Sequence, residues 1–227
     1  MKKTFTALLI GLLILNMSCR KTGNDPGITS GRIDYKITYL NEDLDKKTRN
    51  ILPSRMKLMF DEKQATNNIE GFMGMYKMNA FTNFHTRKSQ TILKVLDKQY
   101  LFKGSRDEQM CCFDTMDDMV IQKTDETKVI AGFNCKKAII SLPSSDETFT
   151  VYYTEDISLK HPNSTNPYKE IEGVLIEFEL KLLHLKMRFV AEKFQPLADY
   201  DFNQQFNRKS KHVSRLQMTQ ILNKLME

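Results

Sequence analysis

Apolar and polar residues alternate along most of the chain after residue 30. In residues 32–40, Ile33, Tyr35, Ile37 and Tyr39 alternate with charged and polar side chains. A period of two places one face of a segment in a core and the other in water, which is typical of a β-strand. The same pattern, interrupted by short turn signals, predicts further strands. They cover residues 56–60, 71–78, 81–87, 91–96, 100–103, 119–123, 135–141 and 149–154.

Residues 173–191 form the most apolar stretch after the N-terminal segment. Val174, Ile176, Phe178 and Leu180 fall at spacing two, with charged residues such as Glu177 between them. Leucine and glutamate also favour helices, but the strict alternation predicts a long strand or a hairpin that turns near His184.

Two segments show a different pattern. Residues 41–54 carry Leu44, Ile51 and Leu52 among charges and predict a short helix that ends at Pro53. Close to the C-terminus, apolar residues follow the i, i+3, i+4, i+7 spacing of an amphipathic helix. These residues are Met218, Ile221, Leu222 and Leu225. Together the patterns predict a mainly β (α+β) chain with one antiparallel sheet of about eight to eleven strands and two helices.

The N-terminus predicts where the protein works. Lys2 and Lys3 precede an apolar run over residues 5–15. This run has the length of the apolar region of a signal peptide, roughly 7–15 residues, and is too short to span a bilayer. Ser18 directly before Cys19 resembles the cleavage box of bacterial lipoproteins, in which the cysteine is lipidated. The alternative is ordinary secretion with Cys19 as a spare thiol.

This pattern predicts three parts of the chain. Residues 1–18 are a signal peptide, residues 19–30 are the lipidated Cys19 and a flexible tether, and residues 31–227 are a single domain. Basic residues, Arg20 and Lys21, follow the cysteine where surface-displayed lipoproteins carry acids. We therefore expect an outer-membrane lipoprotein of the cell envelope that faces the periplasm and is attached to the membrane by acyl chains.

The net charge and the cysteine content limit the partners and the disulfide bonds that the sequence predicts. The formal net charge of +6 is mild and is spread along the chain, so the sequence shows no concentrated basic face and predicts no nucleic-acid partner. Besides Cys19, three cysteines remain: Cys111, Cys112 and Cys135. Adjacent cysteines rarely bond to each other. We therefore expect either one bridge from Cys135 to Cys111 or Cys112, or three buried thiols.

The residues with catalytic or metal-binding potential show no catalytic signature. Met56 and Met59 have the spacing of soft thioether sites for Cu(I), as do two similar pairs, 75/78 and 116/119. Methionine is also an adaptable filler of irregular cores. The histidines form no metal motif, and the grouped carboxylates at 114, 117 and 118 are typical of a solvated turn. We therefore expect no enzyme, no catalytic residue, no metal and no cofactor, and a periplasmic copper carrier ranks third among the functions.

Three segments carry a family resemblance. Residues 130–138 fit the pattern I-x-G-[FY]-x-x-x-K-A, and residues 152–157 fit [WYF]-[YF]-T-x-x-I. Residues 171–176 read Ile-Glu-Gly-Val-Leu-Ile in place of Gly-Leu-Pro-Gly-Leu-Ile. In this order the segments resemble the uncharacterised exported proteins of Bacteroidota known as GLPGLI-type and related domains of unknown function.

The resemblance implies a fold similar to that of the periplasmic lipoprotein carriers. In that fold a curved antiparallel sheet forms an incomplete barrel, a half-barrel, with helices on its concave side. The implied function is binding of an apolar or amphiphilic ligand, such as a lipid or acyl chain, in the concavity. The alternative is a structural or protein-interaction module of the envelope with a filled core. In either case we expect one apolar strand face to line the interior: Ile33, Tyr35, Ile37, Met56, Leu58, Val174, Ile176 and Phe178.

Overall fold

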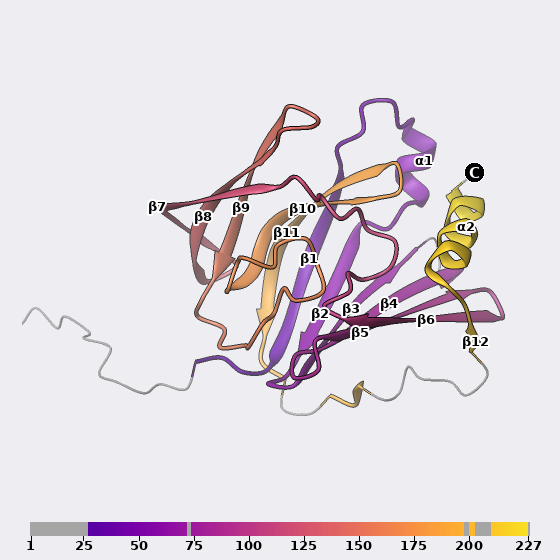
Figure 1. The fold of residues 1–227 in the computed structure, drawn as a ribbon, viewed down its shortest axis with the longest axis horizontal. Helices are drawn as coiled ribbons and strands as arrows, with labels where there is room; N and C mark the ends of the chain where they lie inside the picture. Colours follow the sequence, from indigo (N-terminus) through magenta and orange to yellow (C-terminus); the bar gives the residue numbers. More distant parts are fainter. Residues whose placement is uncertain (1–26, 72–73, 198–199, 203–209, 227) are drawn as a thin grey trace, which may run out of the picture.

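One large open β-sheet dominates the protein (Figure 1). The structure is a computed structural model and describes residues 27–71, 74–197, 200–202 and 210–226. In these residues the sheet has 12 strands and is accompanied by two α-helices. The predicted fold class, mostly β with few helices, is confirmed. Neither described helix has the length and apolar character needed to cross a membrane.

The strands follow one another in space almost as they do in sequence. The order is β12-β6-β5-β4-β3-β2-β1-β11-β10-β9-β8-β7, so β12 and β7 form the two open edges. Every pair is antiparallel except β12 with β6, which is parallel. The strands are β1 (Gly31–Tyr39), β2 (Arg55–Phe60), β3 (Gln64–Glu70), β4 (Tyr76–Asn83), β5 (Lys88–Val95), β6 (Lys98–Arg106), β7 (Val120–Ile130), β8 (Phe133–Leu142), β9 (Glu147–Thr154), β10 (Val174–Leu182), β11 (Leu185–Gln195) and β12 (Lys211–His212).

The register of the strands separates the side chains into two faces. Tyr35 on β1 lies opposite Met56 on β2, which in turn lies opposite Ile69 on β3, and Ile69 lies opposite Met78 on β4. Directly opposed residues point to the same side of a sheet, so these four side chains share the inner face. Their sequence neighbours, Lys36 for example, belong to the outer face. The inner face carries most of the main hydrophobic core.

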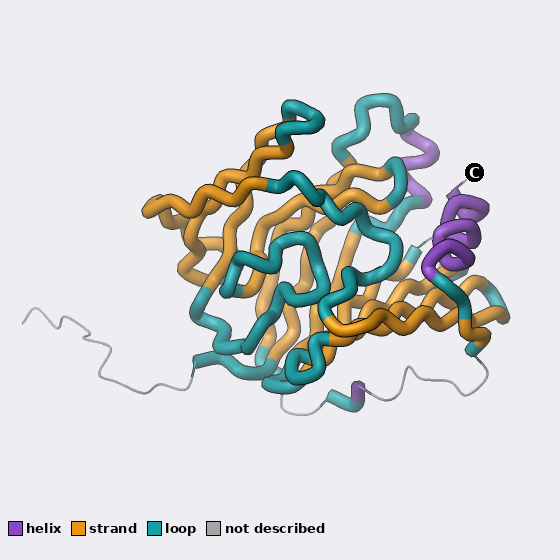
Figure 2. The backbone as a smooth tube through the Cα atoms, viewed as in Figure 1, coloured by secondary structure: helices purple, strands orange, loops and turns teal. Residues whose placement is uncertain are grey.

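Loops cover the inner face more than helices do. The segments 107–119 and 155–173 cross in front of the sheet as long irregular loops (Figure 2). We call these two segments the cover. The helix α2 (Arg215–Met226) lies beside β6 and inserts Met218 and Leu222 into the core.

The helix α1 (Lys46–Ile51) forms in the predicted place but does not fill the concavity. Its N-cap is Asp45, whose carboxylate accepts hydrogen bonds from two backbone N–H groups of the first turn at 2.7 and 3.0 Å. None of its residues is buried, and Ile51 is 49 % exposed. Only the flanking Leu44 and Leu52 touch the core, so the concave side, where both helices were expected, is covered by α2 and the cover.

Candidate functional site

An apolar cavity of about 80 Å³ lies between the inner face and the cover. Its walls come from two halves of the sheet that the topology brings together, β1–β4 on one side and β10–β11 on the other. The sheet contributes Tyr35, Met56, Leu58, Ala65, Asn67, Ile69, Met78, Ala80, Thr82, Val174, Leu175, Phe178, Leu180 and Phe189. Phe84 and the cover residues Met110, Phe113, Leu159, Pro162, Asn163 and Asn166 complete the lining.

The predicted interior residues fall into two groups. Five of them line the cavity: Tyr35, Met56, Leu58, Val174 and Phe178. The other three, Ile33, Ile37 and Ile176, are buried in the surrounding core without reaching the cavity. The alternating pattern therefore marked the inner face, while the position of the cavity on that face depends on neighbouring strands.

One wall of the cavity is a cluster of packed aromatic rings. The Phe178 ring stacks on Phe189 at 5.0 Å and meets the edges of Tyr35 and Tyr168 at 5.8 and 6.3 Å. The Tyr35 hydroxyl donates to the Leu175 carbonyl at 2.7 Å, and the Tyr168 hydroxyl donates to the Glu179 carbonyl. Burial raises the pKa of both phenols, so they remain neutral. This wall is rigid and carries no charge.

Short side chains on β3 and β4 explain why space remains. Ala65 pairs with Thr82 and Asn67 pairs with Ala80, so four small or short residues face the interior together. A close-packed core needs large residues opposite small ones. The side chains that approach this gap include Met56, Met78 and Met110, which adapt to irregular spaces because they are unbranched.

Hydrogen bonds hold the cover over the cavity. The hydroxyls of Thr82 and Thr165 lie 2.7 Å apart, and the Met110 N–H donates to the Thr165 carbonyl at 2.8 Å. The amide of Asn163 donates to the carbonyls of Ile171 and Gly173 at 2.7 and 2.9 Å, which fixes the second cover loop on itself. Opening the cavity requires breaking at least the contacts that join the cover to β4.

The volume sets a limit on what fits. Sites for drug-sized ligands occupy roughly 300–1,000 Å³. If a methylene takes up about the volume of a water molecule, roughly 30 Å³, the cavity of about 80 Å³ accepts about three methylenes. A whole acyl chain does not fit unless the cover moves.

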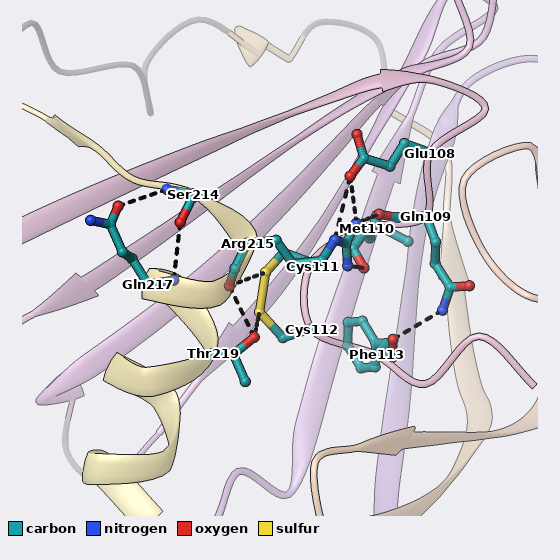
Figure 3. Close-up of a disulfide and its surroundings, with 10 residues drawn as sticks. All are labelled: Glu108, Gln109, Met110, Cys111, Cys112, Phe113, Ser214, Arg215, Gln217 and Thr219. Carbon is teal, nitrogen blue, oxygen red and sulfur yellow. Dashed lines mark hydrogen bonds and ion pairs between the residues drawn. A yellow bond between two sulfur atoms is a disulfide. The ribbon is translucent and has the colours of Figure 1, made fainter.

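The cysteines pair differently from the prediction. Cys111 and Cys112 form a disulfide with each other (Figure 3). Cys135 is a buried free thiol. The bridge predicted from Cys135 does not form, because Cys135 is on β8, which lies near one edge of the sheet. The adjacent pair lies beside α2 and β6 towards the other edge. Burial raises the pKa of Cys135 to about 11, and its thiol donates to the Phe133 carbonyl at 3.4 Å.

The disulfide joins the cover to α2. The hydroxyl of Thr219 on α2 donates to the sulfur of Cys112 at 3.5 Å, and the Arg215 guanidinium reaches the Glu108 carboxylate at 3.2 Å (Figure 3). The same guanidinium lies 5.0 Å from the centre of the Phe102 ring on β6. The first cover loop, α2 and β6 therefore form one connected unit.

A larger polar cavity of about 400 Å³ lies at the β10–β11 turn. Its walls include three acids of the first cover loop, which are typical of a solvated turn: Asp114, Asp117 and Asp118. Lys186 bridges Glu147 at 2.6 Å and Glu179 at 3.6 Å in the same hollow. Burial raises the pKa of Glu179. This mixed charged lining does not suit the apolar ligand predicted above.

The structure separates two of the three methionine pairs that motivated a copper site, 56/59 and 75/78. Met56 faces the cavity, whereas Met59 lies on the outer face opposite Thr66. Met78 lines the cavity, and Met75 is 49 % exposed. Within the described residues, no three His, Cys, Asp or Glu side chains come together as metal ligands. The arrangement does not favour the copper-carrier prediction.

Comparisons with known proteins add little. No family model matches the chain, and no curated protein matches it, so the resemblance to GLPGLI-type proteins remains a prediction. Among solved structures, the crystal structure of LprF from Mycobacterium bovis is a weak structural neighbour. The alignment has 8 % sequence identity and a TM-score of 0.29, and it covers 76 % of this chain and 89 % of LprF. A likeness of this quality carries no argument about function.

Proposed function

We propose that this protein is a non-enzymatic, lipid-anchored protein of the bacterial envelope that binds an apolar group in the cavity between the inner face and the cover. One observation carries the proposal: an unfilled apolar space of about 80 Å³ on the inner face of the sheet. Apolar cavities of roughly this kind remain dry and bind small apolar molecules.

The walls define which part of a ligand fits. The aromatic wall formed by Tyr35, Phe178 and Phe189 offers rigid apolar contact, and Met56, Met78 and Met110 adapt to the shape of a guest. A methyl-terminated tail of about three carbons enters without rearrangement. A longer acyl chain enters as the cover shifts and as the bond between Thr82 and Thr165 breaks.

A second candidate function is an envelope interaction module with a filled core. The small volume of the cavity favours it, because about 80 Å³ is well below the roughly 300 Å³ of common ligand sites. The hydrogen bonds that hold the cover also favour it, since they oppose the opening that a long chain requires. Under this reading the sheet and cover act as a rigid support for a protein partner.

Native mass spectrometry separates the two functions. The chain from residue 19 onward contains every described strand and helix, and we would produce it without an acyl group and purify it without detergent. Saturated fatty acids of increasing length are then added. We expect a bound mass in the wild type, and a loss of that mass in Ala80→Leu, which places a larger side chain in the cavity. Ala138→Ser serves as the control, since Ala138 is buried on β8 outside the lining.

The two functions predict opposite results. An unliganded mass at every chain length, in the wild type as in Ala80→Leu, would refute ligand binding and leave the interaction module. A bound mass that persists in Ala80→Leu would place the ligand elsewhere.

The membrane anchor is tested separately, because Cys19 lies outside the described residues. We expect Cys19→Ser to move the protein from the membrane fraction to the soluble fraction and to abolish incorporation of labelled palmitate. A protein that stays in the membrane fraction without label would overturn the lipoprotein assignment. Digestion of intact cells by protease distinguishes a surface location from the periplasmic one that we propose.

A further inference from the structure

The fold gathers positive charge that looks dispersed in the sequence. On a β-strand, every second side chain points to the same face. Lysines and arginines scattered over β1–β6 occupy the positions that alternate with the core residues. They therefore share the outer face of the sheet, although no two of them form a basic run along the chain.

The strand register places these cations in rows. Lys36 on β1 lies opposite Arg55 on β2, and Lys77 on β4 lies opposite Lys94 on β5. Lys193 on β11 lies opposite Asp34 on β1. We define the basic face by its ten cations, to which four acids are adjacent, Asp34, Glu70, Asp107 and Glu192. The cations are Arg32, Lys36, Arg55, Lys57, Lys77, Lys88, Lys94, Lys103, Arg106 and Lys193.

The acids neutralise only part of this charge. Asp34 pairs with Arg32 at 2.6 Å, Glu192 with Arg55 at 3.4 Å, Glu70 with Lys77 at 3.1 Å and Asp107 with Arg106 at 3.7 Å. The remaining lysines of the face form no ion pair with any described residue, and each is exposed to solvent. They are Lys36, Lys57, Lys88, Lys94, Lys103 and Lys193.

The sheet differs where β11 pairs with β10. Arg188 pairs with the buried Glu177, and Lys186 bridges Glu147 and Glu179. The excess of cations is therefore confined to the half of the sheet from β11 to β6. With strands about 4.8 Å apart, this half is roughly 30 Å wide. Its excess of six positive charges equals the net charge of +6 of the whole chain.

We infer that the basic face docks the protein on an anionic phospholipid surface. Lysines that form no ion pair within the described part of the chain can approach phosphate headgroups, and such attraction is electrostatic and screened by salt. The face also lies within reach of the predicted anchor. β1 begins at Gly31, and the segment from Cys19 spans at most about 40 Å when fully extended. The lipid holds the protein at the membrane, and the basic face determines which side of the sheet lies against it.

Vesicle co-sedimentation tests this inference without the anchor. The chain from residue 19 onward, unacylated, is mixed with vesicles of phosphatidylcholine containing about 30 % phosphatidylglycerol, at roughly 0.05 M and 0.5 M salt. We expect binding at low salt and release at high salt. The triple variant Lys36→Ala/Lys57→Ala/Lys193→Ala weakens binding by roughly a hundredfold, at about fivefold per lysine. The matched control is Lys46→Ala/Lys123→Ala/Lys160→Ala, which removes three exposed lysines outside the basic face.

Each alternative result overturns the inference. An equal loss of vesicle binding in the control triple variant would mean that only the net charge of the protein determines binding. The absence of binding at low salt, or equal binding to pure phosphatidylcholine, would exclude electrostatic docking. Duplex DNA that binds as tightly as the anionic vesicles at the same salt would indicate a general polyanion surface instead of a membrane surface. If both triple variants melt at the same temperature as the wild type, a folding defect does not explain a loss of vesicle binding.

Discussion

Replacement of Ala80 by valine measures whether the cavity exists in solution. Ala80 is 4 % exposed on β4, lies opposite Asn67 on β3 and Thr91 on β5, and lines the cavity. Valine adds two carbons, roughly 60 Å³ when each is taken as the volume of a water molecule. This fits within the cavity of about 80 Å³.

The expected gain follows from two estimates that agree. Each buried methylene contributes about 0.8 kcal/mol, so two contribute about 1.6 kcal/mol. The cavity itself costs about 24 cal/mol per Å³, which is about 1.9 kcal/mol for its whole volume. Since valine is stiff at χ1 and needs one rotamer, we expect a net stabilisation of about 1 kcal/mol.

Urea denaturation gives the measurement. The midpoint should rise for Ala80→Val while the slope remains unchanged, because a constant slope reports constant exposed surface on unfolding. The control is Ala138→Val on β8, where the alanine is fully buried and does not line the apolar cavity. Overpacking there should destabilise the protein by about 1–3 kcal/mol. If Ala80→Val destabilises the protein as much as Ala138→Val does, the space is already filled in solution and the ligand proposal loses its basis.

Four further predictions rest on individual residues and bonds. Thr91→Val should stabilise the fold by about 1 kcal/mol in urea titrations, because the buried Thr91 hydroxyl has no hydrogen-bond partner among the residues that the structure describes. Thr82→Val should instead lower the free energy of unfolding by about 1–3 kcal/mol, since it leaves the hydroxyl of Thr165 in the cover without its hydrogen-bond partner. Effects of the same sign and size in both variants would contradict this reasoning. Burial raises the pKa of Glu179, so the native state holds that proton more tightly than the unfolded chain and stability falls as pH rises through this range. Glu179→Gln should therefore raise the melting temperature at about pH 7 and lose that advantage at about pH 3, and a gain of equal size at both pH values would exclude titration as the cause. Tryptic digestion of unreduced protein should release residues 107–123 as one peptide lighter by two hydrogens, with Cys135 unbridged in a separate peptide. A cross-link between the two peptides would restore the bridge that the structure excludes.

Local alternation was enough to predict most strands but not all of them. β1, β8 and the β10–β11 hairpin follow apolar residues at spacing two, and the tight turn at Leu183 falls beside the His184 predicted for it. The strand β3 was missed because its central residues are Thr66, Asn67 and Asn68, which carry no apolar alternation. It exists because β2 and β4 pair with it on both sides. That is a tertiary effect which a window of sequence does not contain.

The cavity was beyond prediction for a related reason. A strand pattern identifies which residues face inward, but packing depends on what stands opposite each of them. Ala65 pairs with Thr82, and Asn67 pairs with Ala80, only through the register of β3 with β4. A shift of one residue would point these side chains to the other face. The free space is therefore a property of two neighbouring strands together.

The outer face follows the same rule and leads to a different conclusion about charge. Along the chain the cations are interrupted by core residues, and this spacing argued against a basic surface. The interruption is itself the period of two, so it is the condition under which the cations reach one face of a sheet. Lys36 and Lys57 each follow a buried residue in their own strand. The alternation that builds the core therefore also builds the charged surface. For a chain made of antiparallel strands, charge should thus be counted by face after the strands are assigned, because runs of basic residues identify basic helices and tails but not basic sheets.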